Sequence, residues 1–210
     1  MDRWCEQKLW KEWGLNTGGA ELFASSTGLA LCFIPAFWGA PKWTVLLMLL
    51  WASLIVLGVG TFIFHWIPND EDDLASYFDW FPMALTCALL IFMFLEPNLK
   101  YMTTLYAVGA LLLLLCYLLF LILPTDLLDP VFMNAVLVSP PVLVLALYTY
   151  WTLDARLVRV WALLLFSLTV WLINSYLCQS WTPLALLHSV FHIVMAVALW
   201  EAGCISASPP

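Results

Sequence analysis

Apolar residues occur in long runs along most of the chain, and short polar or turn-forming segments separate these runs. Each run approaches the ~20 apolar residues that an α-helix needs to cross the hydrocarbon core of a bilayer. The pattern therefore predicts an all-α integral membrane protein, with seven transmembrane helices bundled into a single domain over residues 1–210. The predicted spans are roughly Ala20–Trp38, Trp43–His65, Tyr77–Leu95, Tyr101–Leu123, Val131–Trp151, Val158–Tyr176 and Pro183–Ala202.

The composition supports a membrane protein and excludes other classes. Of the 210 residues, 64% are hydrophobic and only 10% are charged, whereas about 25% of the residues in a soluble globular domain are charged. The net charge of −7 argues against nucleic acid as a partner, because no basic surface is available to neutralise phosphates. The six cysteines form no C-x-x-C pair, so a thiolate zinc site is not expected.

The distribution of basic residues predicts the orientation of the bundle. The connectors on the side of the C-terminus contain Lys42, Lys100, Arg156 and Arg159. The connectors on the other side contain no Lys or Arg, although the N-terminal tail does. Because cytoplasmic loops carry an excess of basic residues, we expect a cytoplasmic C-terminus and an outside or lumenal N-terminus. The expected location is the bacterial inner membrane, or the ER or Golgi membrane in a eukaryote.

The three histidines of the chain all lie in or at the end of predicted spans. His188 and His192 are four residues apart, so both imidazoles project from one face of the last span. His65 ends the second span. In the predicted topology all three lie in the outer half of the bundle. We expect them to bind one zinc ion and leave a fourth position open; the alternative is three core histidines that bond neighbouring helices.

Two further polar residues in the spans indicate hydrolytic chemistry. Asp79 stands inside an apolar stretch at the depth of the histidines, where it could orient a water molecule and transfer its proton. Thr61 lies four residues before His65, on the same helix face, and could donate to a developing oxyanion. The alternatives are an acid favoured by a helix N-terminus for Asp79 and a bond to the local backbone for Thr61.

These residues resemble a known family. The set Thr61-x₃-His65, Asp79 and His188-x₃-His192 resembles the Ser-x₃-His, Asp and His-x₃-His pattern of the alkaline ceramidases and of the superfamily that includes the adiponectin receptors. Three further segments extend the likeness towards the ceramidases, and the short length resembles the bacterial members. These segments are Trp4-Cys5-Glu6, Ala20-Glu21-Leu22 and Trp171-Leu-Ile-Asn174 followed by Cys178.

The chain departs from the family pattern at several positions. Thr61 replaces the usual Ser, and Asn174 stands where an Asp is common. The resemblance implies a calcium site, for which this chain retains Trp4, Glu6 and Glu21, with Asp2 one residue early. Arg3 and Lys8 occupy the other two ligand positions. An ammonium group is unfavourable in a shell of oxygen ligands, which argues against calcium; Glu21 alone could serve as a structural carboxylate.

Cysteine placement predicts one disulfide. In the predicted topology Cys5 and Cys178 both lie outside the membrane on the N-terminal side. Three other cysteines lie within spans and Cys204 lies on the opposite side. The outer compartment is oxidising if it is periplasm or organelle lumen. We therefore expect a Cys5–Cys178 bridge; the alternative is two unpaired thiols.

Together these observations predict a zinc-dependent hydrolase acting on linear amide bonds. Its expected substrate is ceramide or a related N-acyl lipid taken from the bilayer, and its products are a fatty acid and a sphingoid-type amine. One alternative is a lipid or ligand receptor of the same superfamily that contains zinc and has little turnover. Another is a transporter or assembly factor whose histidines only pack. The sequence leaves the oligomeric state open.

Overall fold

The computed structural model describes residues 5–14, 21–40, 42–67, 74–95, 141–150, 152–178 and 180–208. Within these ranges the regular structure is helical and contains no strand. The predicted span at 101–123 lies outside the described residues, and so does most of the span at 131–151, of which the helix Pro141–Tyr150 is described. Asp2 and Trp4 of the predicted calcium site also lie outside them.

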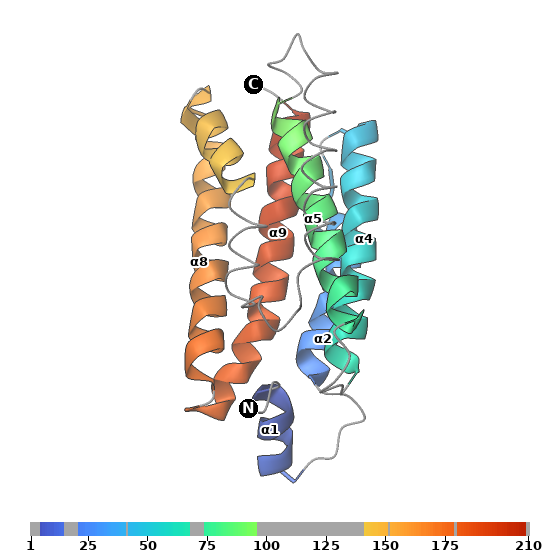
Figure 1. The fold of residues 1–210 in the computed structure, drawn as a ribbon. Helices are drawn as coiled ribbons and strands as arrows, with labels where there is room; N and C mark the ends of the chain where they lie inside the picture. The colour runs from blue at the N-terminus through green and yellow to red at the C-terminus, as the bar shows by residue number, and fades with distance from the viewer. Residues whose placement is uncertain are drawn as a thin grey trace.

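Three helical segments are long and apolar enough to cross a membrane. They are α4 (Val45–Trp66), α8 (Arg156–Leu177) and the segment Thr182–Ala207, in which the 3-10 helix η3 (Thr182–Leu186) leads into α9 (Leu187–Ala207). They run side by side with α5 (Leu74–Leu95) as an elongated bundle (Figure 1). The sequence prediction of helices long and apolar enough to span a membrane is therefore confirmed for these three segments; the seven-span count stays a prediction.

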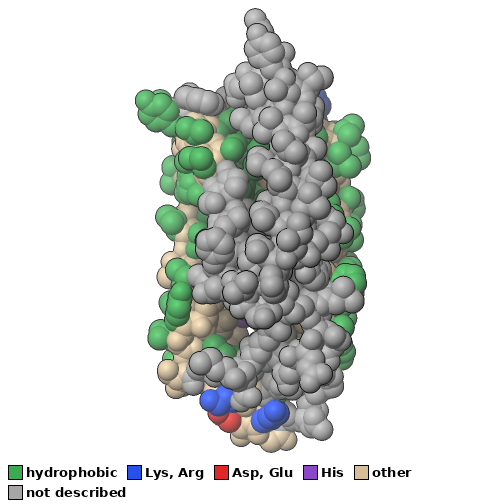
Figure 2. Space-filling view, viewed as in Figure 1, with side chains coloured by type: hydrophobic (Ala, Val, Ile, Leu, Met, Phe, Trp, Pro, Cys, Tyr) green, Lys and Arg blue, Asp and Glu red, His purple; other side chains and the backbone are tan. Residues whose placement is uncertain are grey.

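The outer surface of the bundle is apolar. Hydrophobic side chains lie along both flanks in Figure 2, and the charged side chains visible there lie towards the two ends, most of them at the lower end. Examples of exposed large side chains are Phe37, with 82% of its surface exposed, and Val158, with 68%. Such a surface is unfavourable in water and favourable in contact with lipid chains.

The first predicted span is divided into two helices, α2 (Leu22–Gly28) and α3 (Ala30–Trp38). The interruption is limited to Leu29, whose backbone remains in the α region. Two features of the sequence weaken the helix on either side of it. The Ser25, Ser26 and Thr27 hydroxyls donate to backbone carbonyls one turn earlier, which tends to bend helices. Pro35 inside α3 has no N–H for its helix.

Small residues allow α4 to approach its neighbours closely. A Cβ atom on Gly58 would lie 2.8 Å from the carbonyl oxygen of Gly28 on α2, and one on Gly60 would collide with the carbonyl oxygen of Phe78 on α5. A Cβ on Gly203 of α9 would likewise collide with the side chain of Leu50 on α4. Close backbone approach at small residues is typical of helices packed within a membrane.

A short helix, α1 (Cys5–Glu12), lies at one end of the bundle, opposite the C-terminal end of α9 (Figure 1). A disulfide joins Cys5 to Cys178, with 6.0 Å between their Cα atoms. At the other end of α1, Glu12 accepts a 2.6 Å hydrogen bond from the hydroxyl of Thr182. Both bonds attach α1 to the segment between α8 and α9. The sequence prediction of a Cys5–Cys178 bridge is confirmed.

The buried carboxylate of Glu6 attaches α1 to α2 as well. It accepts hydrogen bonds from the backbone N–H groups of Phe23 at 2.5 Å and Ala24 at 3.1 Å. These are N–H groups of the first turn of α2, which have no partner within their own helix. Burial raises the pKa of the Glu6 carboxyl, and the three N–H donors, including Trp10, oppose that shift. Helix α1 therefore connects α2 with the α8–α9 segment.

Removal of the disulfide tests how strongly α1 holds this end together. We expect the double variant Cys5→Ser, Cys178→Ser to lose about 2–4 kcal/mol of stability, the usual range for a native bridge. The measurement is thermal unfolding in detergent without reductant, with Cys32→Ser, which removes an unpaired cysteine, as the control. Peptide mapping of the parent under non-reducing conditions should recover the linked pair. Alkylatable thiols at both positions would contradict the bridge.

Candidate metal centre

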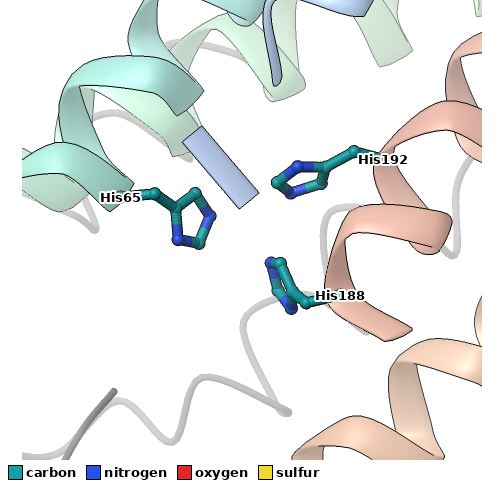
Figure 3. Close-up of side chains that lie close together, drawn as sticks. All are labelled: His65, His188 and His192. Atoms are coloured by element: carbon teal, nitrogen blue, oxygen red, sulfur yellow. The ribbon is translucent and has the colours of Figure 1, made fainter. Parts of the chain in front are cut away.

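The three histidines converge at the end of the bundle that α1 covers. His65 lies at the C-terminal end of α4, and His188 and His192 lie in the first two turns of α9. One candidate ligand atom from each residue lies within 4.8 Å of the other two. The three rings face a common space in Figure 3, and their centroids are 4.6–5.1 Å apart. The cluster could hold a metal ion, as the sequence predicts; zinc as its identity stays a prediction.

Two of the imidazoles are held by groups of the α2 helix and its N-terminus. The Nδ1 atom of His65 lies 2.6 Å from a carboxylate oxygen of Glu21. The Nδ1 atom of His192 lies 3.1 Å from the carbonyl oxygen of Ala24, to which it can donate. Carboxylates and backbone carbonyls are the usual partners of the second ring nitrogen in metal-bound histidines, because they set the tautomer and the orientation of the ring.

The third imidazole is held by α8. The Nδ1 atom of His188 lies 3.2 Å from the side-chain amide nitrogen of Asn174. The amide oxygen of Asn174 is buried and has no hydrogen-bond partner among the described residues. A half-turn of the amide would place that oxygen on His188 and let Nδ1–H donate to it, which satisfies both groups.

All three rings therefore use Nδ1 for a partner outside the cluster. A neutral imidazole that donates through Nδ1 presents Nε2 as its metal ligand. Three Nε2 ligands with oriented outer partners match a zinc site of three histidines with an open fourth position. The donor set thus fits the metal that the sequence predicts.

The amino-acid sequence indicates some of these outer partners and not others. The sequence indicates Glu21 as a calcium ligand or a structural carboxylate, and its pairing with His65 is compatible with the second role. Asn174 belongs to a segment that carries the family resemblance, but the sequence does not indicate its contact with His188. The carbonyl of Ala24 could not have been found, because any residue supplies a backbone carbonyl. Among the described residues, no possible metal-binding group of three side chains contains Glu6 and Glu21. The calcium site therefore stays untested.

Asp79 and Thr61 meet beside the histidine cluster. The Thr61 hydroxyl, one turn before His65, donates to a carboxylate oxygen of Asp79 on α5. Thr61 and His65 lie on one face of α4, so the Thr61–Asp79 pair is about one helical turn from this histidine. Helix α5 begins at Leu74, so Asp79 lies beyond the first turn and is not explained as an acid at a helix N-terminus. The close crossing of Gly60 with Phe78 brings the two residues together.

The methyl group of Thr61 packs against Gly28. A Cβ atom on Gly28 would lie 2.8 Å from the Thr61 methyl carbon and 3.1 Å from its Cβ. With the methyl group against α2, the hydroxyl of this β-branched side chain is directed towards α5 and Asp79. The threonine that replaces the serine of the family pattern is therefore matched by a glycine on the neighbouring helix.

Neither the protein-family models nor the curated proteins match this chain. The interpretation of the site therefore depends on its own geometry.

Loss of a histidine should remove the metal. We expect purified His188→Ala and His192→Ala to retain far less zinc than the parent, because each loses one of three ligands. Glu21→Gln should keep the ligands but weaken zinc affinity by about 10–100-fold, the usual effect of losing a partner of a metal-bound histidine. Metal analysis and competition with a chelator are the measurements. Stoichiometric zinc in both alanine variants would show that the cluster is not the metal site.

A rescue experiment tests the packing of Thr61 on Gly28. We expect Gly28→Ala to cost about 1–3 kcal/mol of stability, the range for overpacking a tight contact. Thr61→Ser removes the methyl group that would lie 2.8 Å from the new Cβ atom at position 28. The double variant should therefore be about 1 kcal/mol more stable than the sum of the two single effects predicts. Unfolding of the four proteins in detergent gives the coupling. Additive effects would contradict this contact.

Proposed function

We propose that this protein is a zinc-dependent intramembrane amidohydrolase that cleaves the amide bond of ceramide or a related N-acyl lipid. The observation that carries the proposal is the juxtaposition of two units, the three-histidine cluster and the Thr61–Asp79 pair. Zinc and a nearby carboxylate are the parts that metal-assisted amide hydrolysis requires. The resemblance of these residues to the alkaline ceramidases points to the same reaction.

The proposed chemistry divides between the metal and two side chains. When bound, zinc would act as a Lewis acid that lowers the pKa of water and polarises the amide carbonyl. Asp79 would accept the proton of the attacking water and transfer it to the leaving amine. The amide and one water thereby become a carboxylic acid and an amine. Because Thr61 donates to Asp79, its best-supported role is to orient this carboxylate; donation to the oxyanion stays a prediction.

We further propose the seven-span topology, with α1 and the metal cluster near the outer or lumenal face of the membrane. The disulfide at the α1 end favours an oxidising compartment there. Arg156, which contacts the Ser208 carbonyl, and Arg159 lie at the opposite end, where basic residues favour the cytoplasm. A substrate drawn from the bilayer suits a site inside the bundle of apolar helices.

The alternative from another class is a receptor of the same superfamily, in which zinc is structural and turnover is negligible. It would use the same three histidines, so metal content cannot distinguish it from an enzyme. The Thr61–Asp79 pair favours the enzyme, because a structural metal needs no proton-transfer group beside it.

Fatty-acid release from a panel of N-acyl lipids, with and without a zinc chelator, tests the proposal. We expect the parent to hydrolyse at least one ceramide-type lipid and to lose that activity on chelation. Asp79→Asn should retain zinc and lose activity on the order of 10²-fold or more, as expected for a general acid–base group. The matched control is Asp154→Asn, which changes an aspartate that binds Arg156 at the opposite end.

The outcomes separate the candidate functions. Zinc without release of fatty acid from any lipid would favour the receptor. Full activity of Asp79→Asn would remove Asp79 from the mechanism. A protein without zinc would leave only packing roles for the histidines.

A further inference from the structure

A groove runs along the outer surface of the bundle between α3 and α9. It has a volume of about 470 Å³, within the range of small-molecule sites. Its walls are formed by Ala30, Phe33 and Phe37 on one side and Ile193 and Val197 on the other, and it ends at Trp38. We call it the α3–α9 groove. Phe33 and Phe37 remain 57% and 82% exposed, so the described helices do not cover these aromatic side chains.

An exposed guanidinium group lies at the Trp38 end of the groove. The guanidinium of Arg159, on α8, lies 5.9 Å from the centre of the Trp38 ring. It also forms a 2.9 Å ion pair with Glu201, which accepts a 2.8 Å hydrogen bond from the Trp38 indole. The Glu201 side chain is only 13% exposed, whereas that of Arg159 is 63% exposed. The surface at this end is therefore cationic, although the pair is neutral overall.

The guanidinium can bind a further anion. Arginine has five N–H donors, and the printed contact with Glu201 involves only Nη2. Phosphate is the oxyanion that its planar fork matches well. The exposed Lys42 follows Trp38 by four residues, in the connector to α4, and adds a second cation at this end of the bundle.

The dimensions and polarity of the groove match one phospholipid. From Ser26 to Trp38 the helices rise about 18 Å at 1.5 Å per residue, which is enough for an acyl chain to cross one leaflet of about 15 Å. We infer that the α3–α9 groove binds the acyl chain of an anionic phospholipid, with the lipid phosphate at Arg159. This lipid belongs to the leaflet at the Arg159 end of the bundle.

The bound lipid is distinct from the proposed substrate. His192, which precedes Ile193, bonds the carbonyl of Ala24 and faces the other histidines. The phosphate position at Trp38 lies at the far end of α3 from Glu21, the partner of His65. The inference depends on the placement of these helices in a membrane and not on hydrolysis, so a protein without amidase activity would still bind the lipid.

Native mass spectrometry of the delipidated protein in detergent tests the inference. The probes are phosphatidylglycerol and phosphatidylcholine with identical acyl chains. We expect the parent to bind one phosphatidylglycerol in preference to phosphatidylcholine. Ala30→Trp fills the groove and should abolish this binding, whereas Ala162→Trp, on the exposed face of α8, should preserve it. Arg159→Gln should lower the affinity for phosphatidylglycerol about tenfold, as expected for a lost charge-assisted hydrogen bond. Arg156→Gln should leave that affinity unchanged.

A photoreactive phosphatidylglycerol gives a second measurement on the unaltered protein. A label carried on its acyl chain should attach to peptides of α3 and α9. Equal labelling of the exposed face of α8 would overturn the inference, and so would equal lipid binding by Ala30→Trp and Ala162→Trp. Equal affinity of the parent for the two lipids would remove the role of Arg159. A parent dimer that Ala30→Trp dissociates would assign the groove to a second copy of the chain.

Discussion

Three imidazoles enclosed in an apolar bundle set the main constraint on this structure. A polar ring nitrogen away from water costs free energy unless it is hydrogen-bonded or bound to a metal. The protein meets this requirement on the outer side of each ring, with Glu21, the Ala24 carbonyl and Asn174. The inner nitrogens then share one small space, which explains why three residues from two helices form a single site.

The covering helix α1 matters because two of those outer partners belong to one short segment. Glu21 precedes α2 and Ala24 lies in its first turn. The same turn donates two N–H groups to the buried Glu6. The disulfide joins Cys5, the residue before Glu6, to Cys178. The disulfide fixes the helix that carries Glu6, and Glu6 binds the first turn of α2. That segment in turn holds His65 and His192.

Close helix approach positions Thr61 and Asp79, whereas hydrogen bonds position the histidines. Gly60 brings the α4 backbone against Phe78, so the next residues along each helix, Thr61 and Asp79, come within bonding distance. Gly28 receives the methyl group of Thr61 on the other side. A glycine lowers the stability of a helix, but its missing side chain permits contacts here that a larger residue would prevent.

The sequence by itself determined the helical class, the apolar segments at α4, α8 and α9, and the shared face of His188 and His192, and it made Cys5 and Cys178 the expected disulfide pair. These features follow from local periodicity, run length and the order of segments along the chain, which need no knowledge of distances between helices. Only the tertiary structure decided that Glu21 holds His65, that Asn174 holds His188 and that a carbonyl of α2 holds His192. It also showed the interruption at Leu29 and the fit of Thr61 to Gly28. Such contacts depend on how closely backbones approach and on groups that every residue carries, so residue type alone does not predict them.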